Sequence, residues 1–322
     1  MCHTCLASHQ PACTGGPGRS QGNSVYAPAC LQEKSIAAKA KDGFALLALD
    51  RQGHDKKLWD TLEQLLETNS AHLGYGADHK GYPRYNRIRM ARAWRLEHPT
   101  LWDRYTGAQQ QVVRDMSVLH RAHKTPNPGL PPKTASAAGK LPGGIRTDVN
   151  ETILMTGTPP KNLLSILSTG PNERFSGSNA GTAYGDGTYL AEDAGKNDQY
   201  VDVDAAYDSN SELHKRLYGH GVQHPGKVFY LLVCRVSLGH HVRTSQHGRS
   251  ATSMDGGFPI FPISFRELAA VPGVSPPVHF HSLLADVMPL ARYREFIVFH
   301  SELIYPEYVI AYHRFNGSNG PV

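Results

Sequence analysis

The sequence of 322 residues lacks any apolar run long enough to cross a membrane, and its first residues lack the apolar segment of a secretory signal. These absences predict an intracellular protein, cytoplasmic or nuclear, with no membrane partner. The chain also has little net charge, because 33 basic and 28 acidic residues leave a formal value of +5. So small an excess suits a phosphate-bearing ligand, but it does not by itself indicate nucleic-acid binding.

Cysteine is scarce: there are five cysteines in the chain, and most of them lie near its start. Cys2 and Cys5 have C-x-x-C spacing, which is half of a zinc site, but the second close pair of a structural zinc site is absent. We therefore predict that the chemistry requires no metal, with Cys2 and Cys5 as weak candidates for ligands. Because large apolar residues are rare at the start of the chain, residues 1–40 are predicted to be a disordered tail.

The rest of the chain is long enough for one large or two medium domains. Apolar residues at helical spacing, followed by an alternating segment, predict a helical lead-in and a first strand over residues 55–123. A stretch rich in Pro and Gly predicts a long loop or linker at 124–147. Residues 148–318 carry strand-like runs separated by long loops with few helices, which is typical of antiparallel sheets and predicts an α+β fold for this core.

Glycines mark the stretch from residue 181 to residue 200, GTAYGDGTYLAEDAGKNDQY. Glycine permits positive φ and lets a ligand approach the backbone closely. The residues TYLA at 188–191 are β-prone and predict a strand behind the glycine turn, and the residues that follow predict a short helix. On its own, the pattern fits either a plain turn, strand and helix with core tyrosines or a ligand-binding surface.

Together with two other segments, this stretch resembles the NAD-binding signature of the diphtheria-toxin-like ADP-ribosyltransferases, the family of poly(ADP-ribose) polymerases and tankyrases. The family's G-x-Y-F/L-A motif and the K-x-x-x-Y helix after it correspond to residues 187–191 and 196–200. Its upstream H-G-T/S strand end corresponds to residues 156–158, and its downstream glutamate corresponds to Glu295. The run YPEYVI at 305–310 is similar to the end of the tankyrases. Three matches in the right order are far more specific than one.

The resemblance implies an ADP-ribosyltransferase fold, with two packed and mainly antiparallel β-sheets, flanking helices and an NAD cleft. NAD+ would then be the co-substrate. Glu295 is implied as the catalytic group that polarises the ribose and the acceptor, because a carboxylate stabilises the oxocarbenium-like centre that forms as nicotinamide leaves. Tyr189 and Tyr200 would hold nicotinamide between their rings, which attract the positively charged pyridinium.

Further contacts to NAD are implied for residues around these groups. Gly157 would hold the carboxamide through its backbone, since glycine allows the close approach. The other implied NAD-binding residues are Thr158, Leu190, Ala191, Lys196, Asn197 and Arg174.

Two residues depart from the family's pattern. The strand-end histidine, which contacts the ribose hydroxyls, is Thr156 here, and its hydroxyl donates and accepts a hydrogen bond with a shorter reach. The serine that binds the carboxamide is Asn197, whose amide also donates and accepts. A threonine at position 156 is compatible with three outcomes: weak NAD binding, altered geometry of the site, or loss of activity.

We carry three functions forward. The first is an NAD-dependent ADP-ribosyltransferase that modifies protein side chains, including its own, with one unit or a chain left open. The second is a catalytically weakened module that binds NAD or ADP-ribose. The third is an NAD glycohydrolase or a nucleic-acid ADP-ribosyltransferase on the same fold, although the sequence shows no clear basic groove in support of nucleic acid.

Overall fold

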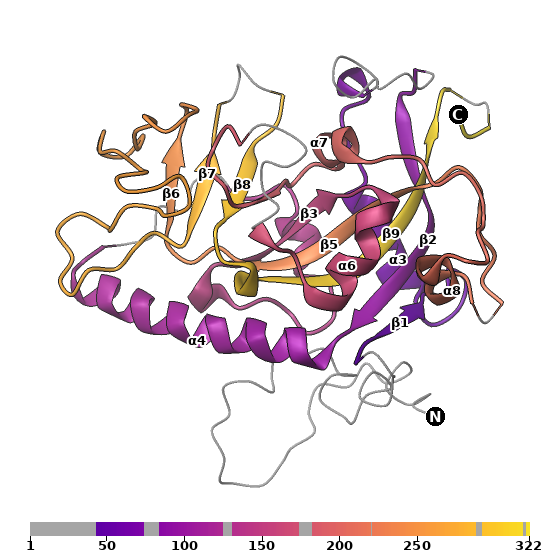
Figure 1. Ribbon diagram of the computed structural model, residues 1–322, viewed down its shortest axis with the longest axis horizontal. Coiled ribbons are helices and arrows are strands. Elements are labelled where there is room, and N and C mark those ends of the chain that lie inside the picture. The colour runs from indigo at the N-terminus through magenta and orange to yellow at the C-terminus, as the bar shows by residue number, and fades with distance from the viewer. Residues whose placement is uncertain are drawn as a thin grey trace, which may run out of the picture.

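The computed structural model describes residues 43–73, 84–124, 131–173, 182–219, 221–287, 292–317 and 320–322. Within these ranges lie two β-sheets, a five-stranded sheet in the order β1-β2-β9-β5-β3 and a four-stranded sheet in the order β4-β8-β7-β6 (Figure 1). Neighbouring strands are antiparallel except β6 and β7, which are parallel. The predicted α+β fold with two mainly antiparallel sheets is therefore confirmed.

The larger sheet is built from long strands and the smaller sheet from short ones. The strands of the larger sheet are β1 (Ala45–Ala48), β2 (Arg87–Glu97), β3 (Glu151–Gly157), β5 (Phe229–Ser237) and β9 (Ile304–Phe315). The strands of the smaller sheet are β4 (Thr188–Leu190), β6 (His241–Thr244), β7 (Ser282–Ala285) and β8 (Glu295–Val298). The candidate site lies where β3 of the first sheet meets β4 of the second, joined by the isolated pairing of Met155 with Ala191.

Helices cover both faces of the larger sheet. The α-helices are α3 (Lys56–Leu65), α4 (Pro99–Arg121), α5 (Ala135–Ala138), α6 (Pro160–Thr169), α7 (Ala194–Asn197) and α8 (Glu212–Leu217). Short 3₁₀ turns are η2 (Ser70–His72), η4 (Thr147–Val149), η6 (Asp198–Tyr200) and η7 (Ser301–Leu303). The longest helix, α4, runs along the lower edge of the molecule in Figure 1. In the described part of the chain, no helix is long and apolar enough to cross a membrane.

The core consists of two main hydrophobic clusters, one on each face of the larger sheet. Successive side chains of a strand point to opposite faces. Accordingly Leu232 of β5 packs in the cluster that also holds Leu163 of α6 and Leu190 of β4. Its neighbour Leu231 packs in the other cluster, together with Leu62 of α3. Because both faces are covered, β5 is buried along its whole length, which explains its nearly unbroken apolar sequence.

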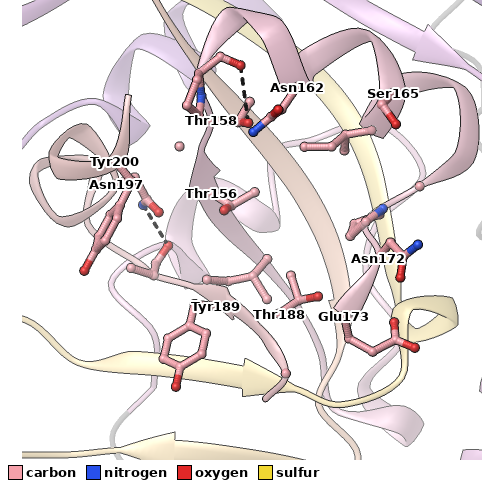
Figure 2. A pocket seen from close by; sticks show the side chains of 18 of the residues that line it. Thr156, Thr158, Asn162, Ser165, Asn172, Glu173, Thr188, Tyr189, Asn197 and Tyr200 are labelled. Carbon is pink, nitrogen blue, oxygen red and sulfur yellow. Dashed lines mark hydrogen bonds between the residues drawn. The ribbon is translucent and has the colours of Figure 1, made fainter. Parts of the chain in front are cut away.

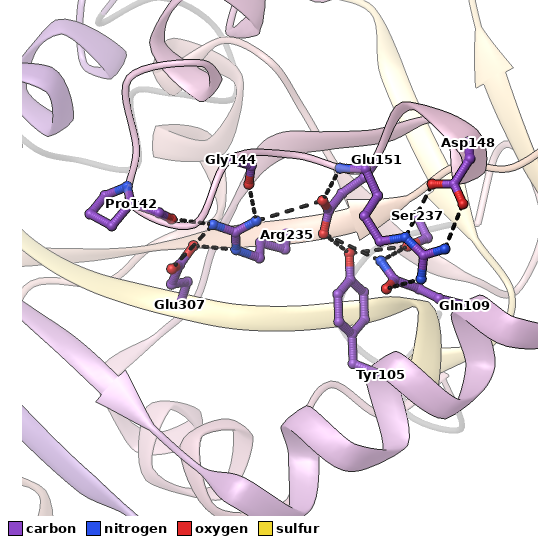
Figure 3. Close-up of polar contacts among 10 residues, drawn as sticks. Tyr105, Gln109, Pro142, Gly144, Asp148, Glu151, Arg235, Ser237 and Glu307 are labelled. Carbon is purple, nitrogen blue, oxygen red and sulfur yellow. Dashed lines mark hydrogen bonds and ion pairs between the residues drawn. The ribbon is translucent and has the colours of Figure 1, made fainter. Parts of the chain in front are cut away.

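A buried polar network fixes the inner strands of the larger sheet to α4 (Figure 3). Arg235 of β5 is fully buried and pairs with Glu307 of β9, with 2.7 Å between Nε and Oε2. The same guanidinium donates to backbone oxygens in the segment 142–144. Tyr105 of α4 donates to Glu151 of β3 at 2.6 Å. The network therefore fixes the start of β3, the strand whose other end reaches the candidate site.

The described part of the Pro/Gly-rich stretch packs against this framework. Residues 131–147 include α5, and the side chains of Ala137, Ala138 and Leu141 are buried in the cluster that contains α3. The predictions for the tail at 1–40, and with it Cys2 and Cys5, fall outside the described residues.

Candidate active site

A cavity of about 800 Å³ opens where the end of β3, the start of α6, β4, α7 and the start of β8 come together (Figure 2). Every described residue that the sequence predicts for the site lines this cavity. These residues are Thr156, Gly157, Thr158, Tyr189, Leu190, Ala191, Lys196, Asn197, Tyr200 and Glu295. The predicted phosphate contact Arg174 lies outside the described residues.

Gly157 at the end of β3 is required by the packing of the chain itself. A Cβ atom at this position would lie 2.1 Å from the backbone oxygen of Asn197 and 2.9 Å from Val201. Real Cβ atoms do not approach other atoms so closely, so any larger residue would push α7 away from β3. The close approach of these two elements forms one wall of the cavity.

The turn before β4 depends on glycine in the same way. Gly185 has a φ of +99°, a conformation that residues with a side chain rarely adopt, and a Cβ there would meet the ring of Phe299 at 2.7 Å. A Cβ on Gly187 would lie 2.8 Å from the backbone oxygen of Val298. Both glycines thus let the turn and β4 pack directly against β8, which brings Tyr189 and Glu295 into the same cavity.

The turn also fixes the ring of Tyr189. Its hydroxyl accepts a hydrogen bond from the backbone N–H of Tyr184 at 2.8 Å and donates one to the backbone oxygen of Gly185 at 2.9 Å. Burial raises the pKa of Tyr189, so the phenol stays neutral at physiological pH. The hydroxyl is therefore occupied by the turn, and the ring is held in position at the cavity wall.

Glu295, at the first position of β8, pairs with Lys196 of α7. The distance between Lys196 Nζ and Glu295 Oε1 is 3.1 Å, and both side chains are largely buried. Arg294, the cation next to Glu295 in the chain, instead contacts Glu192 at 2.6 and 2.8 Å. Among the described residues, Glu295 Oε2 has no hydrogen-bond partner, so one carboxylate oxygen is left for a ligand.

Lys196 links this carboxylate to the second predicted tyrosine. Its ammonium group donates to the hydroxyl of Tyr200 at 2.9 Å and lies 5.0 Å from the centre of that ring. Burial alone would lower the pKa of Lys196, but the adjacent Glu295 and Tyr200 outweigh it and raise that pKa. Lys196 thus remains a cation at physiological pH. The ring of Tyr200 is 40% exposed and lies at the mouth of the cavity.

The two residues that depart from the family's pattern behave differently. The hydroxyl of Thr156 has no hydrogen-bond partner among the described residues, and Figure 2 shows this side chain in the middle of the cavity. The side chain of Asn197, by contrast, is buried and already engaged. Its amide nitrogen donates to the backbone oxygen of Asp193 at 2.9 Å and to that of Ala191 at 3.5 Å. Asn197 therefore fastens α7 to the end of β4.

A buried carboxylate that sequence reasoning missed anchors the segment of α7 and η6 that carries Lys196 and Tyr200. Asp198 is 1% exposed and accepts hydrogen bonds from the hydroxyls of Tyr85 and Tyr312, and from Arg314 at 3.0 Å. These three donors lie more than a hundred residues away along the chain, at separations of 113 to 116. No local sequence signal could have indicated this contact.

The opposite wall of the cavity is a polar stripe of α6 that was also missed. Asn162, Ser165 and Thr169 line the cavity, whereas Leu163 and Leu167 of the same helix are buried in the core. The polar residues recur at i, i+3 and i+7, which places them on one helical face. Here the sequence did carry a signal, because this spacing marks a polar face opposite the apolar one. The cavity extends past Asn172 and Glu173.

One group of side chains in the described residues has the donor types of a metal site: Asp204, His214 and His224. The Nε2 atoms of His214 and His224 lie 2.8 and 3.4 Å from the same oxygen of Asp204. The Nδ1 atom of each ring accepts a hydrogen bond from a backbone N–H, of Asp208 and Gly226 respectively. In the neutral rings the proton is therefore on Nε2, which has no lone pair for a metal. Nε2 of His214 donates to Asp204, whereas Nε2 of His224 makes no hydrogen bond among the described residues. The group fits a hydrogen-bonded cluster and not a metal site.

The family model for the poly(ADP-ribose) polymerase catalytic domain matches residues 74–314. This span contains all the residues that line the cavity, and it includes the segments at 156–158, 187–200 and 295–310 that carry the resemblance in the sequence.

Proposed function

The chain belongs to the family of poly(ADP-ribose) polymerase catalytic domains, and we propose that it is an NAD-dependent ADP-ribosyltransferase. In this proposal it moves ADP-ribose from NAD+ to protein side chains, its own included, and releases nicotinamide. The observation that carries the proposal is the cavity in which Glu295, Lys196, Tyr189, Tyr200 and Thr156 meet.

Glu295 is the proposed catalytic residue. In the reaction, the bond between the ribose C1′ and the nicotinamide nitrogen breaks, and its electron pair leaves with nicotinamide. The ribose carries positive charge at that moment, and a fixed carboxylate beside it stabilises this charge without reorganising. Glu295 Oε2 would accept a hydrogen bond from a ribose hydroxyl, while Oε1 stays paired with Lys196 at 3.1 Å. The acceptor then bonds to C1′ and loses its proton, for which the carboxylate is the nearest base.

Lys196 is proposed as a positioning residue. Its contacts with Glu295 and Tyr200 hold the carboxylate and the second ring in fixed relation to each other. Precise placement of a catalytic group contributes strongly to rate, because a displacement of about 1 Å costs on the order of 10²-fold. Asp198 in turn holds the helix that presents Lys196, through its buried contacts with Tyr312 and Arg314.

The nicotinamide ring is proposed to lie between Tyr189 and Tyr200. The first ring is held by the turn before β4, and the second is partly exposed at the cavity mouth. Each ring face attracts a cationic pyridinium by about 0.5–2 kcal/mol. That attraction is strongest before nicotinamide leaves, since nicotinamide is neutral once it is released.

Thr156 supports a second candidate, a weakened module that binds NAD or ADP-ribose. Its hydroxyl is proposed to contact a ribose hydroxyl, with a shorter reach than the histidine of the family's motif. Under that alternative, NAD would stabilise the protein against heat while transfer stayed undetectable.

The test uses purified protein with NAD+ labelled in the ADP-ribose part, and follows nicotinamide release and label on protein together. The proposal expects both signals in the wild type and neither in Glu295→Gln. The matched control is Glu302→Gln, because Glu302 is an exposed glutamate on η7, outside the cavity. Nicotinamide release without label would indicate a glycohydrolase, and label on added nucleic acid in place of protein would indicate the nucleic-acid transferase.

A further inference from the structure

A second cavity, of about 560 Å³, lies at the edge strand β1, and it shares no lining residue with the first. Its wall is formed by residues 48–52 at the end of β1, by Trp59 of α3, by Arg92 and Ala93 of β2, and by residues 221–223 before β5. A volume of this size lies within the range of small-molecule sites. The candidate active site makes no use of any of these residues.

Two guanidinium groups line this cavity without a carboxylate partner. In the described parts of the chain, neither Arg51 nor Arg92 forms an ion pair. The polar contact of Arg92 is a hydrogen bond of 3.1 Å from Nη1 to the backbone oxygen of Ala91. Arg51 lies over the ring of Trp59, with 5.8 Å between its guanidinium carbon and the ring centre. An arginine fork without an acid partner is suited to accept an anionic ligand.

The position of Arg92 on its strand is itself irregular. The pairing of β2 with β9 shifts register between Met90 and Arg92. Such bulges change the direction in which a side chain points, and they are common next to binding sites. The bulge therefore interrupts the regular pairing of β2 with β9 and places Arg92 on the cavity wall.

Trp59 adds a second, independent observation. It is 2% exposed, lines the cavity, and its indole Nε1 has no hydrogen-bond partner among the described residues. A buried N–H donor without an acceptor is unfavourable and calls for an explanation, such as a bound group that accepts from it. The carboxylate on the wall, Asp50, is engaged locally, because its Oδ1 accepts from the backbone N–H of Gln52 at 3.0 Å.

We propose that this cavity binds a small ligand with two phosphate groups, such as a nucleoside diphosphate. The planar forks of Arg51 and Arg92 match pairs of phosphate oxygens, and two such forks suit a diphosphate better than a single anion. The side-chain amides of Gln52 and Gln223 supply further donors on the same wall. The site is separate from the NAD cavity and does not depend on the proposed function.

The test reads the indole N–H signals of ¹⁵N-labelled full-length protein during titration with ADP and with inorganic pyrophosphate. The chain has three tryptophans, and Trp59→Phe identifies the signal of Trp59. Trp102 of α4 packs against Tyr105 and Tyr305 and does not line the cavity, so its signal reports on the fold. The proposal expects the Trp59 signal to move and saturate with both ligands while that of Trp102 stays in place.

The matched variants are Arg51→Gln and Arg92→Gln, with Arg89→Gln as control, because Arg89 is an exposed arginine of the same strand that does not line the cavity. Binding should weaken at least tenfold in each of the first two and stay unchanged in the control. Arg51 lies outside the strands, so Arg51→Gln keeps the test valid if Arg92→Gln disturbs the fold. No movement of the Trp59 signal, or equal movement in Arg51→Gln, would overturn the proposal.

Discussion

Glu295 and Glu307 lie on the adjacent chain segments β8 and β9 and face a cation each, but their surroundings differ. Glu307 is fully buried, and Arg235 contacts it through Nε at 2.7 Å and Nη2 at 3.5 Å. Glu295 lines the cavity, and within the described ranges it receives one contact, of 3.1 Å from Lys196, so its second oxygen has no partner there. The two glutamates therefore have different tasks. Glu307, whose two oxygens both contact Arg235, holds the framework, whereas Glu295 keeps one oxygen for a ligand.

The largest expected effect follows from breaking the buried ion pair of Glu307 and Arg235. Glu307→Gln would leave Arg235 as a buried charge without its partner, which typically costs 3–5 kcal/mol of stability. Urea unfolding should therefore show a loss of roughly this size. The matched change, Glu295→Gln, should lower the free energy of unfolding by less than about 1 kcal/mol, because the glutamine still offers an acceptor to Lys196, which also keeps its hydrogen bond to Tyr200. Similar losses in both variants would remove the distinction between the two acids.

Activity should respond in the opposite order. Loss of a group that stabilises transition-state charge costs about 10²–10³-fold in rate. Glu295→Gln should thus lower transfer to this extent, whereas Glu307→Gln should retain most of its activity at temperatures where it stays folded. Initial rates of nicotinamide release, with the folded fraction checked by circular dichroism, would measure both.

A third kind of buried polar group lies outside the cavity and lacks a hydrogen-bond partner in the described residues. His240 Nδ1 and His241 Nε2 have no hydrogen-bond partner among the described residues. Burial, together with nearby cations such as Arg243, lowers the pKa of His241 to about 4, and burial with the adjacent His241 and His281 lowers the pKa of His240 to about 4. In the unfolded chain both would titrate near 6.5. Between these values the unfolded chain binds protons that the folded chain does not.

Stability should therefore fall as pH decreases from about 6.5 toward 4, by roughly 3 kcal/mol for each histidine. Thermal unfolding at a series of pH values would measure the slope. His241→Gln should flatten the slope within this window, whatever its effect at neutral pH. An unchanged slope would mean that other groups cause the acid sensitivity. His247→Gln, a change outside this pair, is the control.

These contrasts also show what the sequence could and could not reveal. The strand-like runs in residues 148–318 predicted an antiparallel α+β core, and the most apolar strand in this region is β5, which is buried along its whole length. Strands as short as β6 and β7 carry too few residues for a periodic signal. Motif resemblance indicated ten of the residues that line the cavity, but not the polar face of α6. It could not identify Asp198, because its partners, among them Tyr312, come from distant segments that only the fold brings together.

Lys196 offers a further test of how Glu295 is positioned. Lys196→Gln would remove the contact that orients Glu295 Oε1 and should lower kcat about ten- to hundredfold, since catalysis is sensitive to placement. Lys196→Arg should recover part of the loss, because the charge is retained. Steady-state kinetics would separate a positioning role, which lowers kcat, from plain NAD binding, which raises KM. Lys215→Gln, at a surface lysine, should change neither.

The smallest effect is expected at Thr156, whose hydroxyl faces the cavity and has no hydrogen-bond partner in the described part of the chain. Thr156→Val would remove that hydroxyl and should raise KM for NAD+ about two- to tenfold, the worth of one hydrogen bond of roughly 0.5–1.5 kcal/mol. Thr156→His would restore the reach of an imidazole, so activity should stay equal or rise. An inactive wild type revived by the histidine would mean that the threonine disables the site. Lower activity in Thr156→His would instead mean that the cavity is adapted to threonine, and that Glu295 acts beside a side chain of shorter reach than histidine.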